Sequence, residues 1–216
     1  PLSREMAETP AFQGAMWLSM LLYLPLSLLF WHAPGLVHWH GTSMAEQVCR
    51  RLEPLVCEVL VSCNRNQARY AAFATRVLGD TQQDYPGPLM GILQGLRALR
   101  GSHLLVVPCD LPAISTALLV GLQSLSRAHP ERPVVVRQGA FLQPLVCVLP
   151  GTLGKVVEAA WAAGERSPAH LWQQLQAVEL PCTEDDPQLT NVNTPVVLAA
   201  ALEPVRHNNR STYAGY

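Results

Sequence analysis

A single carboxylate follows a continuous apolar run and is well suited to hold a metal ion. The run ends at Val107. Asp110 lies three residues later, between Pro108 and Pro112 in "PCDLP". Carboxylate oxygens suit Mg²⁺, which keeps several waters and bridges substrate phosphates. The two prolines stiffen the turn, and a metal ligand needs a rigid mount. The alternative is that Asp110 caps the following helix.

Small and polar residues follow two other runs. Ser62 opens "SCNRNQARY", whose hydroxyl and amide side chains can bind a base or a sugar, although Asn and Ser also favour plain turns. Asp80 follows "RVLG", and Gly87-Pro88 then precede an apolar segment. Pro88 suits the first turn of a helix, where free N–H groups and the helix dipole can hold an anion. A tight turn into a tightly packed helix is the structural alternative.

Two amides lie close together near the C-terminus, in "LTNVNTPVVLAAAL". Asn191 and Asn193 alternate, so an extended backbone points both side chains the same way. They are candidates for clamping a ligand. Thr194 then caps a predicted helix that begins at Pro195.

Strands and helices alternate along the part of the chain that must position these residues. Apolar runs predict strands at Cys57–Ser62, Leu104–Val107 and Val134–Val136. Helices are predicted at Met44–Leu52 after Thr42 or Ser43 as N-cap, Leu89–Leu99, Ala117–Ser126 and Leu153–Ala163. The pattern indicates an α/β fold with a doubly wound, mainly parallel sheet, which binds ligands at the carboxyl ends of its strands.

Composition favours one domain without nucleic-acid chemistry. The chain has 216 residues, 49% of them hydrophobic, and a formal charge of −1, which fits a single core without a basic nucleic-acid footprint. Six scattered cysteines without a C-x-x-C pair indicate free thiols in a reducing, cytoplasmic setting. Lys155 is the only lysine.

The segment before Gly35 is unusually apolar. Residues 9–45 carry no charged side chain, and Met16–Trp31 reads "MWLSMLLYLPLSLLFW". These sixteen residues fall short of the ~20 that span a bilayer, and Pro25 interrupts a helix. A basic start and a small-residue cleavage site, which mark a signal peptide, are missing. We therefore expect neither a membrane span nor a signal peptide.

Four motifs follow one another along the chain: "VSCNRNQARY", "LGDTQQDYPGPLMGI", "LLVVPCDLP" and "TNVNTPVVLAAA". In this order and spacing they resemble the molybdenum cofactor guanylyltransferase family. The resemblance covers Gly35 to about Leu202. It implies a Rossmann-like nucleotidyltransferase domain that transfers GMP from GTP to molybdenum-bearing molybdopterin and releases pyrophosphate. GTP, molybdopterin and Mg²⁺ are the implied ligands, and proteins of molybdoenzyme maturation are further partners.

The same resemblance assigns roles to individual residues. Asp110 is the expected Mg²⁺ ligand. Ser62, Asp80, Gly87 and Pro88 are expected around the guanine nucleotide, and Asn191 and Asn193 at the pterin phosphate. These parts suit phosphoryl transfer, which depends on positioning and charge neutralisation.

The N-terminal segment departs from the family. The family begins with a strand and a loop of the form L-A-G-G-x-x-x-R-M-G followed by Asp-Lys-Gly, but here Ala33 and Pro34 stand where the acid and the lysine belong. Loss of the loop and the lysine predicts a poor or inactive enzyme. It also removes the first, central strand unless the apolar stretch replaces it. We hypothesise that residues 1–34 arise from a shifted reading frame or a mis-set start.

The predicted organisation is a divergent segment at 1–34, a nucleotidyltransferase domain at 35–203 and a polar tail at 204–216. Two other functions stay open. One is a non-catalytic protein that binds the pterin or the nucleotide, and the other is a transferase with a different nucleotide or acceptor.

Overall fold

The computed structural model describes residues 34–63, 66–79, 87–192 and 197–199. Its helices of one turn or more are α4 (Met44–Leu52), α5 (Gln67–Tyr70), α6 (Pro88–Ala98), α7 (Thr116–Ala128), α8 (Gly154–Ala162) and α9 (Pro168–Gln174). Its strands are β1 (His38–Trp39), β2 (Thr42–Ser43), β3 (Leu60–Ser62), β4 (Arg76–Leu78), β5 (His103–Val106), β6 (Val134–Gln138), β7 (Phe141–Pro150) and β8 (Val178–Cys182). Four 3-10 turns complete the described elements: η2 (Pro34–Leu36), η3 (Glu53–Leu55), η4 (Gly151–Leu153) and η5 (Pro187–Leu189).

The predicted strands and helices that fall within the described residues are present, mostly with shifted ends, and the strand predicted at Cys57–Ser62 is shortened to Leu60–Ser62. Helix α4 has the predicted bounds, and Ser43 is its N-cap, accepting a hydrogen bond from the Glu46 amide. The other three predicted helices correspond to α6, α7 and α8. The predicted cap at Thr194 lies outside the described residues, as do the apolar stretch Met16–Trp31 and the C-terminal tail.

The α/β class is confirmed, but the sheet is mixed rather than mainly parallel. Four strands pair in the order β5-β7-β6-β8, and β7 runs antiparallel to both of its neighbours. Only β6 and β8 are parallel within this sheet, and β3 pairs in parallel with β4 in a separate pair of strands. The difference arises from β7, a ten-residue strand that the sequence patterns did not indicate.

Proline explains why β7 escapes pattern recognition. Proline lacks the ladder donor and is confined to strand edges and irregularities. The register between β6 and β7 shifts at Val135/Val136, where Val135 faces Cys147 and Val136 faces Gln143, so Pro144 lies within the irregularity. The irregularity is held from outside the sheet, because the indole Nε1 of Trp172 donates to the Pro144 carbonyl at 2.9 Å.

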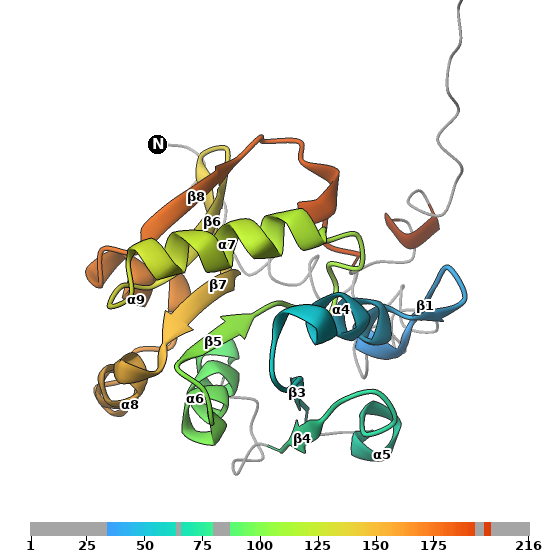
Figure 1. The fold of residues 1–216 in the computed structure, drawn as a ribbon, viewed down its shortest axis with the longest axis horizontal. Coiled ribbons are helices and arrows are strands. Elements are labelled where there is room, and N and C mark those ends of the chain that lie inside the picture. Colours follow the sequence, from blue (N-terminus) through green and yellow to red (C-terminus); the bar gives the residue numbers. More distant parts are fainter. Residues whose placement is uncertain (1–33, 64–65, 80–86, 193–196, 200–216) are drawn as a thin grey trace, which may run out of the picture.

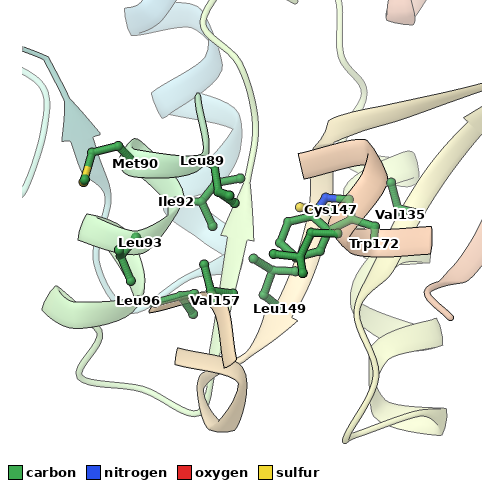
Figure 2. Packing of buried hydrophobic residues seen from close by; sticks show 11 residues of the cluster. Leu89, Met90, Ile92, Leu93, Leu96, Val135, Cys147, Leu149, Val157 and Trp172 are labelled. Carbon is green, nitrogen blue, oxygen red and sulfur yellow. The ribbon is translucent and has the colours of Figure 1, made fainter. Parts of the chain in front are cut away.

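Helices cover both faces of the four-stranded sheet, which confirms a doubly wound arrangement. Helix α7 packs on one face, against Val134, Val136 and Val148. Helices α6, α8 and α9 pack on the other, where the alternate residues Val135, Cys147 and Leu149 point. Figure 1 shows α7 crossing the sheet, and Figure 2 shows Trp172 stacked beside Cys147 and Leu149, with Val157 and the α6 leucines beyond them.

A search of the described residues finds no helix that is both long and apolar enough to cross a membrane.

Trp172 is fully buried and ties α9 to β7. We expect Trp172→Ala to lower the free energy of unfolding by about 3–5 kcal/mol, because it leaves a cavity and an unpaired Pro144 carbonyl. Urea unfolding followed by circular dichroism measures the loss. Val156→Ala is the control, since Val156 on α8 is 40% exposed and should change stability by about 0.5 kcal/mol or less. Equal losses in both variants would contradict this account of the core.

Candidate functional site

Asp110 lies beyond the carboxyl end of β5, on a half-buried turn. It does not cap the helix that follows, because Ser115 is the N-cap of α7 and accepts from the Leu118 amide at 3.1 Å. None of the ion pairs formed within the described ranges involves Asp110. The carboxylate is therefore available to a ligand or a metal ion.

A backbone hydrogen bond brings the C-terminal amide segment to Asp110. The Val192 amide donates to the Asp110 carbonyl at 2.8 Å. Val192 itself is buried with Trp39 and Met44, which anchors the segment. Its neighbour Asn191 is exposed. The segment that carries Asn191 is thus held against the turn that carries Asp110. The sequence analysis selected these two residues independently.

The segment that leads to Asn191 is fixed to the start of α7 by a polar network. The Ser115 hydroxyl donates to Gln188 Oε1 at 2.6 Å, and the Ser115 amide donates to the same atom at 3.1 Å. Gln188 in turn donates from Nε2 to Asp186 Oδ2 at 2.9 Å. Sequence reasoning missed this support. The only local signal was Asp186 before Pro187, where Asp186 caps η5.

Ser62, Gly87 and Pro88 form a second group. Gly87 is the N-cap of α6 and has φ +98°, a conformation that favours glycine, and Pro88 is the first helical residue. A Cβ added at Gly91, in the first turn of α6, would lie 3.4 Å from the Ser62 hydroxyl. The end of β3 and the first turn of α6 are therefore adjacent. Ser62, Gly87 and Pro88 are all exposed.

A compact cluster around Tyr70 connects the two groups. Leu36, Ala45 and Tyr70 are buried together, with Cys63 and Cys109 packed against them. Cys63 follows Ser62, and Cys109 precedes Asp110, so the cluster lies between the two strand ends. Gly35 fits tightly into it: an added Cβ would lie 3.1 Å from the Tyr70 hydroxyl and 3.2 Å from Cys109 Sγ. Sequence reasoning missed the roles of Gly35 and Tyr70.

The thiol beside Asp110 is held in its protonated form by burial. Burial raises the pKa of Cys109 to about 12, and the neighbouring Asp110 charge adds to the effect. Burial likewise raises the pKa of Tyr70, with the Cys109 and Cys63 thiolates as smaller causes. Since the thiolate is the reactive form, this shift disfavours a nucleophilic role for Cys109, which packs against the Tyr70 cluster.

Burial also raises the pKa of Asp110, although a backbone hydrogen bond opposes the shift. A half-buried carboxylate without a cationic partner gains from a bound cation. Within the described ranges no three His, Cys, Asp or Glu residues gather into a metal cage. One carboxylate is nevertheless sufficient for Mg²⁺ when water and substrate phosphates complete the shell. The donor set therefore fits a substrate-bridged Mg²⁺.

Two predicted site residues are not tested by this geometry. Asp80 and Asn193 lie outside the described residues. Lys155 lies on α8, which packs against α6, and Figure 1 shows α8 on the other side of β5 from α4. Lys155 therefore does not replace the missing lysine at position 34.

Comparison with known proteins identifies the family. The MobA-like NTP transferase domain matches residues 35–178. The molybdenum cofactor guanylyltransferase of one Pseudomonas fluorescens strain is 45% identical over 166 residues, covering 77% of this chain and 83% of that protein. This chain belongs to the molybdenum cofactor guanylyltransferase family. The guanylyltransferase of Pseudomonas aeruginosa is 44% identical over 165 residues, 76% of this chain and 83% of its own length.

Solved structures support the fold of this guanylyltransferase family member. Molybdopterin-guanine dinucleotide biosynthesis protein A from Archaeoglobus fulgidus superposes with a TM-score of 0.63 at 20% identity, covering 77% of this chain and 87% of that one. A 2-C-methyl-D-erythritol 4-phosphate cytidylyltransferase from Thermus thermophilus gives a TM-score of 0.62 at 15% identity, covering 78% and 92%. The nucleotidyltransferase fold expected from the sequence is confirmed.

The raised pKa of Asp110 has a consequence for stability. Because the folded state holds the Asp110 proton more tightly, stability falls as pH rises from the ordinary pKa of 3.8 through the raised value. In metal-free buffer, Asp110→Asn removes this penalty, so we expect the variant to be more stable than the parent at pH 7. The difference should shrink as pH falls toward about 4.

Urea midpoints across this pH range measure the effect. Asp185→Asn is the matched control, because Asp185 is exposed and its substitution should leave the profile unchanged. An Asp110→Asn variant that is less stable than the parent at pH 7 would contradict the burial argument.

Proposed function

We propose that this protein transfers GMP from GTP to molybdenum-bearing molybdopterin. An oxygen of the pterin phosphate attacks the α-phosphorus of GTP, a new P–O bond forms, and the bond to the β-phosphate breaks to release pyrophosphate. The observation that carries the proposal is the backbone hydrogen bond of 2.8 Å from the Val192 amide to the Asp110 carbonyl, which holds the segment of Asn191 against the turn that carries Asp110 in a member of this family.

The two groups of the site divide the substrates between them. Ser62, Gly87 and Pro88 surround the position proposed for the nucleoside, with Asp80 as a further contact. Asn191 and Asn193 are proposed to orient the pterin phosphate. The Asp110 turn lies between them, because Cys109 packs in the same cluster as Cys63 and Tyr70. This order of contacts suits an in-line transfer between two phosphates.

Mg²⁺ is the proposed metal, and Asp110 is its proposed ligand. When bound, the ion neutralises charge on the phosphates and orients the α-phosphorus. Asp110 supplies the fixed anionic anchor, since its turn is held by Val192 and bounded by Pro108 and Pro112. Asn191 supplies a neutral donor, which adds no charge repulsion toward a phosphate.

The sequence before Gly35 lacks the lysine and the glycine loop of the family, and this lowers the turnover rate that we expect. The family lysine falls at the position of Pro34, and Gly35 packs against Cys109, so position 34 lies close to the Asp110 turn. Without the lysine and the glycine loop, the triphosphate loses charge neutralisation and oriented N–H groups. We therefore propose slow turnover. The same loss favours the second candidate, a protein that binds pterin or nucleotide without catalysis.

Transfer assays separate the two candidates. With Mg²⁺, GTP and molybdenum-bearing molybdopterin, we expect measurable formation of the guanine dinucleotide, and Asp110→Ala should lower kcat by at least about 100-fold. Asp185→Ala, which removes an exposed carboxylate, is the control and should retain the parent rate. Pterin binding without turnover in the parent would support the binding protein instead. Turnover with another nucleoside triphosphate but not with GTP would overturn the assignment of GMP.

Position 34 offers a gain-of-function test. Pro34→Lys returns one cation to the triphosphate, and a charge-assisted hydrogen bond is worth about 1.5–3 kcal/mol. We expect GTP to bind roughly 10–100-fold more tightly, as measured by isothermal titration calorimetry with Mg²⁺.

Pro34→Gln is the matched control, because it adds a long neutral side chain and should give little gain. Equal gains in the two variants would show that removal of proline, rather than added charge, is responsible.

A further inference from the structure

The chain that follows β8 connects the sheet to the Asp110 turn. It leaves β8 after Cys182, passes through the η5 turn and reaches the Asp110 carbonyl through the Val192 amide. Figure 1 shows it leaving the end of β8 and passing to the start of α7. We name residues 183–192 the Asn191 segment, after the residue proposed to contact the pterin phosphate.

Gln138, the last residue of β6, binds the beginning of the Asn191 segment. Its side-chain Nε2 donates to the Glu184 carbonyl at 2.9 Å, and it reaches the Asp186 carbonyl more weakly, at 3.5 Å. A side-chain amide has two N–H donors, so one Gln138 side chain can serve both carbonyls. The backbones are close here as well, since a Cβ added at Gly139 would lie 3.1 Å from Glu184 Cβ. The Gly139 amide also donates to the Cys182 carbonyl at 3.2 Å.

A neighbouring glutamine fixes the orientation of the Gln138 amide. Gln143 of β7 donates from Nε2 to Gln138 Oε1 at 2.7 Å. Because the amide group carries its acceptor oxygen and its donor nitrogen on different sides, a donor held at Oε1 directs Nε2 toward the Asn191 segment. Both glutamines are half-buried. They therefore act as one unit, in which Gln138 is the member that reaches the segment.

Asp186 transmits this contact to the rest of the segment. Its carbonyl also accepts from the Leu189 amide at 3.1 Å, and Leu189 is buried in the core cluster that contains α7. The Asp186 carboxylate accepts from the backbone amide and the side chain of Gln188, at 3.2 and 2.9 Å. Gln188 in turn accepts from Ser115. A set of hydrogen bonds joined through Asp186 therefore runs from the end of β6 to the start of α7.

We infer that Gln138 is a positioning residue, which holds the Asn191 segment on the path that leads to the Asp110 turn. Burial of Leu189 keeps the segment close to the sheet, but apolar burial is not directional. Hydrogen bonds are directional, so those of Gln138 set the orientation in which the segment enters the η5 turn. The inference rests on the proposed function in one respect, because the pterin contact of Asn191 is itself proposed.

Amide hydrogen exchange of the full chain, read by NMR, measures the positioning directly. Gln138→Met keeps the length of the side chain and removes its polar atoms, so the Val192 amide should exchange about tenfold faster than in the parent. Gln138→Glu keeps an oxygen for Gln143 but loses the donor to the segment, and should show the same acceleration. The Gly151 amide, which donates to the Ser102 carbonyl before β5, is the internal reference and should be unchanged.

Two further variants are matched to Gln138→Met. Gln173→Met makes the same change at an exposed position on α9 and should exchange like the parent. Adding Gln143→Met to Gln138→Met should cause no further acceleration at Val192, because Gln143 acts through Gln138.

The transfer reaction distinguishes positioning from a general structural role. Gln138→Met should raise KM for molybdenum-bearing molybdopterin about tenfold and leave kcat and KM for GTP within about twofold, because a loosened Asn191 weakens binding of the pterin alone. A parent that forms no dinucleotide would contradict the proposed function. Exchange at Val192 would then still decide whether Gln138 positions the segment.

Several results would overturn the inference. Unchanged exchange at Val192 in Gln138→Met would show that burial of Leu189 is sufficient to place the segment. Equal acceleration at Val192 and Gly151 would show a general loss of stability. A rise in KM for GTP alone would place the effect of Gln138 at the nucleotide instead of the pterin.

Discussion

Strand β7 holds the larger sheet together, and the site depends on that constraint. It is hydrogen-bonded to β5 on one side and to β6 on the other. Because β5 has no other described strand partner, the turn that carries Asp110 is placed by β7. Core residues on both faces, among them Cys147 and Val148, belong to this same strand. A bulge in β7 is fixed in turn by the indole of Trp172.

Around that rigid sheet, the site consists of loops that a few hydrogen bonds hold together. One bond connects Val192 to Asp110, and another connects Gln188 to Ser115. The side chains facing solvent are mainly neutral, while Asp110 is a half-buried anion. Burial of the ionised Asp110 carboxylate lowers the stability of the fold, and a bound cation offsets this loss. Cation binding therefore requires the ionised form of Asp110, whereas the metal-free fold is more stable with Asp110 protonated.

Local patterns predicted much of this architecture. A candidate N-cap at Thr42 or Ser43 marked the start of α4, and apolar runs located β5 and β6. Strand β7 was missed because it contains Pro144 and Pro150, and a proline within a run argues against a strand. The sheet accommodates both prolines because of the register in which β7 pairs with β5 and β6. Pro181 similarly obscures β8. Strand direction was mispredicted for the same reason, since an unrecognised antiparallel strand changes every pairing next to it.

The candidate site likewise has a part that local sequence patterns predicted and a part that they missed. Chain position after predicted strands selected Asp110 and Ser62, and alternation with Asn193 selected Asn191. The structure brings the segment of Asn191 to the Asp110 turn. The Ser115–Gln188 contact joins residues 73 positions apart and left no local pattern. Gly35 likewise matters only because Tyr70 and Cys109 close around it. Spacing along the chain can select candidates, but only the packed structure shows what supports them.

The packing of Gly35 also fixes the point at which any preceding residues join the described structure. Since Gly35 is held between Tyr70 and Cys109, residues joined in front of it start beside the Asp110 turn whatever their sequence. A short tethered peptide experiences an effective concentration in the millimolar range near its anchor. This protein can therefore be used as a scaffold on which alternative phosphate-binding peptides, fused ahead of residue 35, compete for one prearranged edge.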